Sequence, residues 1–244
     1  MPVFHINYEP DKAKVLSGID ERVKSGEPGY ICVADGNILT MVHKDLEYRK
    51  VVQGSIFSIV DSNWVPVFVK RLYGRTWQQY CGSQIFDDIT RAGKYRMYFI
   101  GAKREVLDAL KSKLTEINPA IGDMEFIELP FCKVEDFDYE GIAKEINKDS
   151  PDIIWLSLGA PKQEIFASKL TPLLKKGVVI PVGAVFNFRS GLGIRRAPQW
   201  MVKCRIEFVW RIFLEPRKQV GRCWNIICTL PSIYKEEKKS RGRI

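Results

Sequence analysis

The segment at residues 151–164 constrains the fold more than any other part of the chain, and it reads PDIIWLSLGAPKQE. Its apolar run is bounded by residues that break regular structure, a pattern typical of a central parallel strand covered on both faces. Gly159 follows the run, and Pro161 comes two residues later. Proline is tolerated at the start of a helix, where its missing N–H would have had no partner. The segment therefore predicts a buried strand that passes through a glycine turn into a helix.

The start of that helix predicts an anion site. Free backbone N–H groups and the positive end of the helix dipole face outward at the carboxyl edge of the sheet, where an anionic ligand can dock. Lys162, Gln163 and Glu164 occupy the first turn, and we expect them to be exposed. A structural role explains the glycine and the proline, but it explains three exposed polar residues less readily.

The rest of the chain alternates apolar runs with helical patterns. Strands are expected at residues 30–33, 55–60, 96–100, 125–129 and 178–182, and helices at 39–50 and 106–117. This alternation predicts an α/β fold with a Rossmann-like parallel sheet flanked by helices. Strands end at residues 35–37, Asp61, Gly101, Gly159 and Gly183, all small or polar. Because ligands bind outside the carboxyl ends of parallel strands, these endings indicate one shared cleft.

The net charge of +9 is unevenly placed. Residues 189–244 carry 14 of the 38 Lys and Arg residues but only four of the 29 Asp and Glu residues, a net charge of +10. Residues 1–188 have a net charge of −1. Three of the six tryptophans, Trp200, Trp210 and Trp224, also lie in the basic part. We therefore expect an α/β catalytic body at 1–188 and a basic, Trp/Arg-rich C-terminal helical appendage at 189–244.

The composition of the appendage restricts its partners. Arginines interleaved with aromatic residues suit a polyphosphate or an anionic membrane surface, where indole rings lie at the level of the lipid headgroups. Nucleic acid is the competing partner, although no known nucleic-acid motif supports it. A second copy of the chain is another candidate for an apolar appendage. A dinucleotide oxidoreductase is less well supported, because the chain lacks G-x-G-x-x-G after its first strand.

Cysteine spacing and hydropathy indicate the cellular compartment in which we expect the protein. The six cysteines form no C-x-x-C pair, and several sit inside apolar runs, which predicts reduced thiols in a cytosolic protein. The first residues lack the basic-then-apolar order of a signal peptide. No window reaches about 18 consecutive apolar residues, so no membrane-spanning helix is expected.

Several rare motifs occur in order in the second half of the chain. They are LGAPKQE at 158–164, VGAVFNF at 182–188, RRAPQW at 195–200 and EPR at 215–217, with Glu207, Trp210 and Arg211 between the last two. Together they resemble the WecG/TagA/CpsF glycosyltransferases, and the resemblance extends from about residue 30 to residue 224. It implies an inverting, metal-independent enzyme without a cofactor. Such an enzyme moves a sugar from a UDP donor to an undecaprenyl-diphosphate-linked saccharide in bacterial cell-surface polysaccharide synthesis.

The resemblance also implies roles for single residues. Asp61 matches the family's catalytic base, although Ser62 follows it here in place of the usual glycine. Without the resemblance, a turn-forming or helix-capping Asp would be the commoner interpretation. Asn37 is kept from the family's Thr-x-Asn segment. Gln79 stands where the family often has an arginine, and Arg75 is the other candidate for its phosphate role.

Donor binding is expected at the strand ends and in the motifs. The candidates are Asn37, Gly101, Lys103, Gly159, Lys162, Gln163, Glu164, Gly183 and Phe186. Acceptor or phosphate binding is expected from Arg196, Arg211, Arg217 and Arg222. These cations would replace a metal ion, because no acidic cluster has clear metal-ligand character; surface ion pairs with Glu207 and Glu215 are the alternative role for the arginines.

The resulting expectation is a cytoplasmic glycosyltransferase, peripheral on the inner face of the bacterial plasma membrane. Its partners would be a UDP-sugar, the lipid-linked acceptor and the membrane surface, with a homo-oligomer as a further expectation and no nucleic acid. The alternative function is a basic nucleic-acid-binding module without enzymatic activity, which would bind oligonucleotides with a steep dependence on salt.

Overall fold

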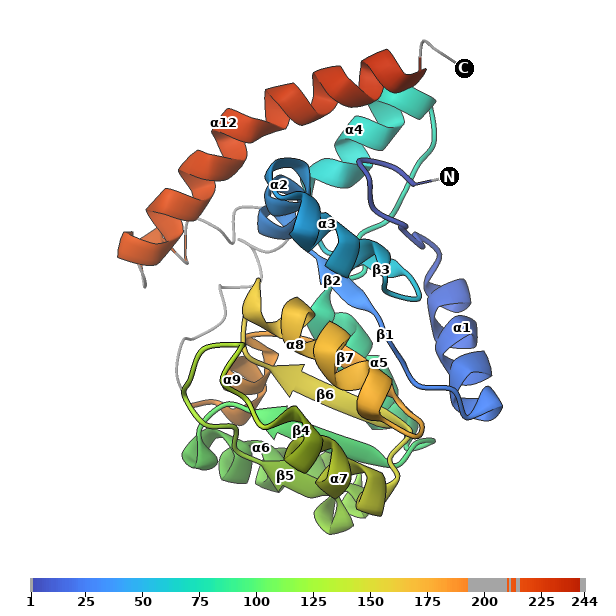
Figure 1. Ribbon diagram of the computed structural model, residues 1–244, viewed down its shortest axis with the longest axis vertical. Coiled ribbons are helices and arrows are strands. Elements are labelled where there is room, and N and C mark those ends of the chain that lie inside the picture. The colour runs from blue at the N-terminus through green and yellow to red at the C-terminus, as the bar shows by residue number, and fades with distance from the viewer. Residues whose placement is uncertain (1, 193–209, 211, 214–215, 242–244) are drawn as a thin grey trace.

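A computed structural model describes residues 2–192, 210, 212–213 and 216–241. Its main sheet is parallel and has the strand order β1-β7-β6-β4-β5 (Figure 1). The strands are β1 (Gly29–Tyr30), β4 (Met97–Gly101), β5 (Glu125–Ile127), β6 (Ile153–Ser157) and β7 (Val178–Pro181). β1 leads directly into β2 (Cys32–Ala34), which pairs in parallel with β3 (Ser58–Val60). The α/β fold with a parallel sheet is therefore confirmed.

β6 lies at the centre of this sheet, as its apolar sequence predicts. Every residue of the strand is buried. Trp155 lies opposite Phe99 of β4 and Ile180 of β7. Successive side chains point to opposite faces of a strand, so Ile154 and Leu156 join one hydrophobic cluster while Ile153 and Trp155 join the other.

Helices cover both faces of the sheet. They are α1 (Lys12–Ser25), α2 (Gly36–Lys44), α3 (Leu46–Gln53), α4 (Trp64–Tyr73), α5 (Gly82–Ala92), α6 (Arg104–Ile117), α7 (Tyr139–Asp149), α8 (Lys162–Leu170), α9 (Val185–Ser190) and α12 (Pro216–Arg241), with 3₁₀ turns η1 (Pro119–Asp123) and η2 (Thr171–Leu173). Buried residues of α1, α5, α6 and α9 pack in one cluster. Those of α2, α3, α4, α7 and α8 pack in the other.

The helix expected at 39–50 is in fact two helices that meet at Asp45. The Asp45 carboxylate accepts hydrogen bonds from the N–H groups of Glu47 (2.9 Å) and Tyr48 (3.0 Å), so it caps α3. Its backbone is extended, at φ −122° and ψ 113°, which ends α2. An Asp at this position satisfies N–H groups that would otherwise lack partners at a helix start. The expected strand at 55–60 is likewise shorter and begins at Ser58.

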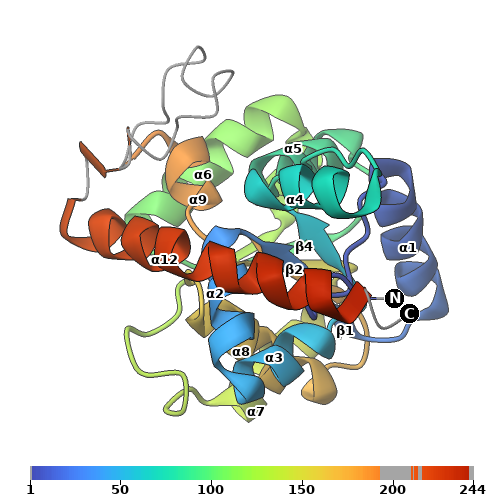
Figure 2. The ribbon, with the colours of Figure 1, turned by 90° about the horizontal axis from the view of Figure 1, so that it is seen from above.

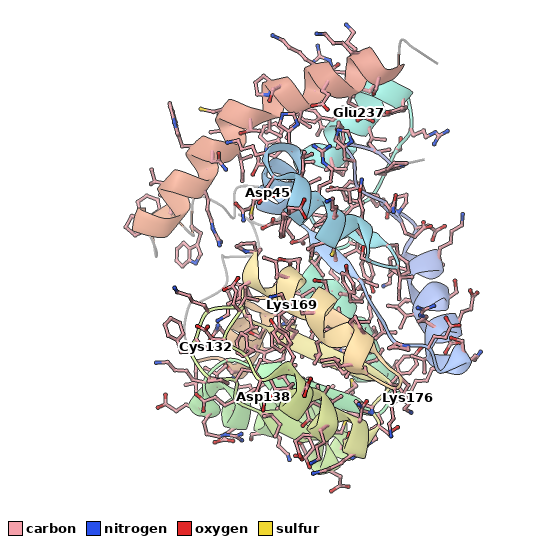
Figure 3. All side chains as sticks on the ribbon, in the orientation of Figure 1. Asp45, Cys132, Asp138, Lys169, Lys176 and Glu237 are labelled. Carbon is pink, nitrogen blue, oxygen red and sulfur yellow. The ribbon has the colours of Figure 1, made fainter. Side chains whose placement is uncertain are left out.

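The C-terminal helix α12 confirms the expected helical appendage. It crosses over α2, and its last turns reach the N-terminal segment at Phe4 (Figures 1 and 2). Leu230 and Ile233 are buried against the body. The Glu237 carboxylate accepts the N–H of Phe4 at 3.0 Å and the hydroxyl of Tyr73. Figure 3 shows Glu237 on the side of α12 that faces α4.

A second acidic residue fixes the same end of the appendage. Glu236 contacts both His5 Nε2 at 2.9 Å and His43 Nδ1 at 3.0 Å. The boundary expected between residues 188 and 189 falls inside α9, and residues 193–209 lie outside the described part of the chain. Among the described helices, none combines the length and the hydropathy that crossing a bilayer requires.

Candidate active site

The carboxyl ends of the parallel strands converge on one edge, where most of the expected site residues lie. Asp35 follows β2, and its carboxylate accepts the N–H groups of Asn37 and Ile38, each at 2.9 Å. Asn37 therefore occupies the first turn of α2, next to the carboxyl end of β2, where this cap holds it. Sequence reasoning named the asparagine; the structure adds the aspartate that positions it.

Asp61 follows β3 and is held through its backbone. Its N–H donates to the carbonyl of Ala34 at 3.2 Å, and its carbonyl accepts the side-chain amide of Gln79 at 2.7 Å. Ser62 is buried, and its hydroxyl accepts the N–H of Trp64 at 3.2 Å. The half-buried Asp61 is thus fixed at a strand end. Gln79 contacts the backbone of Asp61, so the residue at the family's arginine position has a structural role here.

Tyr8 is a residue of this region that sequence reasoning missed. The N-terminal segment lies alongside β3 through a parallel bridge between Tyr8 and Ser58. The Tyr8 hydroxyl is buried and has no hydrogen-bond partner among the described residues. Burial raises the pKa of Tyr8, and the nearby carboxylates of Asp35 and Asp61 raise it further. The hydroxyl therefore lies within electrostatic reach of both carboxylates, a proximity that no local sequence signal indicates.

Gln163 joins the two glycine turns that follow β6 and β7. Its side-chain oxygen accepts the N–H of Gly159 at 3.0 Å. A Cβ on Gly183 would lie 3.4 Å from the same oxygen. Both glycines have positive φ, 81° and 57°, a conformation that L side chains rarely adopt. The Ser157 hydroxyl donates to the Gly183 carbonyl at 2.7 Å, so these predicted donor residues lie close together at the ends of β6 and β7.

Glu164 corrects the expectation of an exposed first turn. Its side chain is 0% exposed and Gln163 is 5% exposed, because α8 packs against α3. The carboxylate accepts the Gln163 amide at 2.8 Å and the Tyr48 hydroxyl at 3.0 Å. Burial raises the pKa of Glu164 to about 7, against the opposing effect of these two hydrogen bonds, and Asp35 adds to the rise. Glu164 therefore holds the Gln163 side chain in place and has no exposed surface that a ligand could contact.

Lys162, the remaining member of that turn, points to a neighbouring loop. Its ammonium donates to the Cys132 carbonyl and lies 4.7 Å from the centre of the Phe137 ring. The loop that carries Cys132 lies beside the start of α8 (Figure 3). This contact orients the cation beside the start of α8.

Three other candidates have distinct surroundings. A Cβ on Gly101 would lie 2.4 Å from the Ser157 carbonyl oxygen, so close approach of β4 to β6 already requires glycine there. Lys103 is exposed immediately before α6. Phe186 is fully buried, with its ring 6.0 Å from that of Phe86. Phe186 shapes the core beneath the β7 turn, and we leave its side chain out of the proposed donor site.

The arginine candidates are only partly described. Arg222 of α12 donates to the Ala160 carbonyl at 3.4 Å, which places its guanidinium over the turn between β6 and α8. Arg196 and Arg211 lie outside the described residues, as does the side chain of Arg217. In the described ranges, no group of three or more His, Cys, Asp or Glu residues is arranged to hold a metal ion. Metal independence stays a prediction.

The arrangement combines a carboxylate at the end of β3 with cations and a helix start after β6. A half-buried aspartate can accept a proton from a hydroxyl group. The start of α8 with Arg222 above it can stabilise a diphosphate. This division of roles suits transfer of a group away from a diphosphate leaving group.

Known proteins are similar to this chain over most of its length. The model of the glycosyl transferase WecG/TagA/CpsF family matches residues 1–243. The chain is 27% identical over 211 residues to the N-acetylglucosaminyldiphosphoundecaprenol N-acetyl-beta-D-mannosaminyltransferase of Bacillus subtilis (strain 168), covering 81% of this chain and 76% of that protein. It is 24% identical over 213 residues to the protein of the same name from Staphylococcus aureus (strain NCTC 8325 / PS 47), covering 86% and 81%. The chain therefore belongs to the WecG/TagA/CpsF family of glycosyltransferases.

Proposed function

We propose that this glycosyltransferase moves a hexose-type sugar from a UDP donor to a saccharide carried on undecaprenyl diphosphate, in bacterial cell-surface polysaccharide synthesis. The observation that carries the proposal is the placement of Gly159, Gln163 and Gly183 at the carboxyl ends of β6 and β7, with Asp61 at the carboxyl end of β3. The relatives' names support a lipid-diphosphate acceptor. Family membership favours an enzyme over a nucleic-acid-binding module.

Asp61 is the proposed general base. An Asp carboxylate is normally ionised at neutral pH and accepts a proton when it comes within hydrogen-bond reach of a hydroxyl. It would take the proton of the acceptor hydroxyl, and the oxygen would form its bond to the anomeric carbon. The bond from that carbon to the UDP oxygen would break on the opposite face, with its electron pair leaving on UDP. Configuration at the anomeric carbon is inverted.

The departing diphosphate requires positive charge. The N-terminal end of α8 supplies the positive end of a helix dipole, although Gln163 already engages the Gly159 N–H. Arg222 lies over the same turn through its contact with Ala160, and a guanidinium binds phosphate oxygens with two parallel hydrogen bonds. We propose that these groups act in place of a metal ion, with Lys103 and Lys162 at the rim.

Membrane docking is the proposed role of α12. Val220, Trp224 and Ile227 lie at i, i+4 and i+7 and are 53%, 69% and 59% exposed. This spacing places them on one helix face, and the indole of an interfacial helix lies at headgroup level. This exposed apolar face supports a peripheral position on the inner membrane face, where a lipid-linked acceptor is held. A second copy of the chain is the competing occupant.

Substitution of Asp61 tests the chemistry. We expect Asp61→Asn and Asp61→Ala to lower turnover by about 10²–10⁴-fold, the usual contribution of a general base. UDP affinity, measured by calorimetry, should be largely kept. Asp138→Asn is the matched control, because Asp138 caps α7 by accepting the Gly141 N–H at 2.9 Å and Asn caps equally well. Near-normal turnover in both Asp61 variants would remove this residue from the mechanism.

A further inference from the structure

A small pocket opens between the start of α4 and the segment that follows this helix, and one of its lining residues contacts the backbone of Asp61. Its volume is about 330 Å³, near the lower end of the roughly 300–1,000 Å³ that ligand sites occupy. It is lined by Asn63, Pro66, Thr76, Trp77, Gln78 and Gln79. None of these side chains is charged, so the pocket is poorly suited to a diphosphate.

The lining has the chemistry of a carbohydrate site. Three amides and one hydroxyl offer both donors and acceptors, and the indole of Trp77 offers a flat apolar face. The Trp77 ring packs edge-on against Tyr8, with 5.8 Å between centroids and 61° between planes. An aromatic ring with neutral hydrogen-bonding side chains around it matches a pyranose ring, which has an apolar face and a rim of hydroxyls.

The residues of the pocket are linked to Asp61 by contact and by sequence. Gln79, which lines the pocket, donates its amide hydrogen bond to the Asp61 carbonyl at 2.7 Å. Asn63 lies two residues after Asp61, at the start of α4. A ligand seated in this pocket is therefore held next to the base by residues that also fix the base.

Sheet order places this pocket away from the glycine turns. β3, which ends at Asp61, pairs with β2 at one side, whereas the turns with Gly159 and Gly183 follow β6 and β7 of the main sheet. The residues that line the pocket lie at the start of α4 and in the segment after this helix, so they do not belong to the main sheet. The uncharged pocket and the proposed diphosphate region therefore follow different strands, and Asp61 ends the strand that leads to the pocket. Separate sites suit inversion, because the acceptor oxygen attacks the anomeric carbon on the face opposite to the departing diphosphate.

We propose that this pocket is the subsite for the acceptor's sugar ring, with an uncharged pyranose seated on Trp77 and its reactive hydroxyl directed at Asp61. The proposal rests on the function proposed above and assigns one of its two sugars to a place in the fold. The remainder of the acceptor, its diphosphate and lipid, extends out of the pocket.

Kinetics of pocket variants provide the first test. The substrate is a short-chain alkyl diphosphate that carries N-acetylglucosamine. Trp77→Ala should raise the acceptor KM by about ten-fold or more, equivalent to about 1.4 kcal/mol, and leave the donor KM within about twofold. Trp77→Phe, which keeps an aromatic face, should recover most of the loss. Trp64→Ala is the matched control, because Trp64 is 47% exposed on α4 and does not line the pocket. An unchanged acceptor KM, or a rise in the donor KM instead, overturns the proposal.

Binding without turnover provides the second test. The Trp77 indole N–H signal, assigned by its loss in Trp77→Phe, should shift in ¹⁵N NMR spectra when the sugar-bearing diphosphate is added. It should not shift with the same alkyl diphosphate lacking the sugar, nor with UDP. An equal response to the sugar-free compound shows that the pocket holds lipid or diphosphate and refutes the assignment.

The two tests separate the pocket from the function. A sugar-specific shift in a protein that transfers nothing keeps the pocket assignment and removes the proposed function. Transfer activity with no response at Trp77 keeps the function and removes the pocket.

Discussion

Replacing the buried Glu164 by Gln should change the pH dependence of stability. The pKa of Glu164 is raised from 4.5 to about 7 in the folded protein, chiefly by burial. The folded chain therefore binds this proton more tightly than the unfolded chain, and stability falls as the pH rises from about 4.5 to about 7. Glu164→Gln removes the titration and keeps the shape of the side chain.

The magnitude follows from the two pKa values. Titration of Glu164 destabilises the native state by about 1 kcal/mol at pH 5 and by about 3 kcal/mol at pH 8. Relative to the wild type, Glu164→Gln should therefore gain roughly 2–3 kcal/mol between these pH values. For a chain of this length, that corresponds to roughly 5–10 °C in Tm.

Urea denaturation of both proteins at several pH values between 5 and 8 measures this difference. All other titrating groups are shared, so their contributions cancel. Tyr48→Phe is an informative companion, because Tyr48 donates a hydrogen bond that lowers the pKa of Glu164; its loss should move the transition to higher pH. A wild-type-minus-variant difference that stays constant across this range would refute the buried, titrating carboxyl.

Three further predictions concern backbone, surface and metal. Gly101→Ala should lower the free energy of unfolding, measured in urea, by about 3 kcal/mol or more, because its Cβ would lie 2.4 Å from a backbone oxygen. The control Gly74→Ala, at φ 67° and with no described atom within 4 Å of its Cβ, should cost only about 1–2 kcal/mol. Equal losses would contradict the close approach of β4 and β6. Trp224→Ala should reduce co-sedimentation with anionic phospholipid vesicles and change stability by less than about 0.5 kcal/mol; undiminished vesicle binding would remove Trp224 from the docking face. EDTA should leave transfer activity unchanged, and a loss restored by added Mg²⁺ would show metal dependence.

The central strand and its helix could be predicted from sequence because local signals agree there. An apolar run, a glycine and a proline each favour the same strand, turn and helix at residues 151–164, and the structure has β6 and α8 there. The break at Asp45 was missed because an aspartate within an apolar periodicity resembles an exposed helix position. Only the capping bonds to α3 distinguish it.

The position of the candidate site in the fold could be predicted, but the contacts between its residues could not. Motifs located Asp61, Gly159 and Gln163 at strand and helix ends, since such positions follow from chain order. Burial of Glu164 was not predictable, because a charged residue in a first turn normally favours solvent and only packing of α8 on α3 reverses this. Tyr8 could not be found either, because its bridge to Ser58 spans about 50 residues of chain.

The most direct test of the account is a crystal structure of the protein with UDP. The account predicts the diphosphate at the carboxyl edge of the sheet, against the start of α8 and within reach of Arg222, with the Asp61 carboxylate facing the position of the anomeric carbon. UDP bound at another face, or an edge filled by packed side chains that excludes it, would contradict the account.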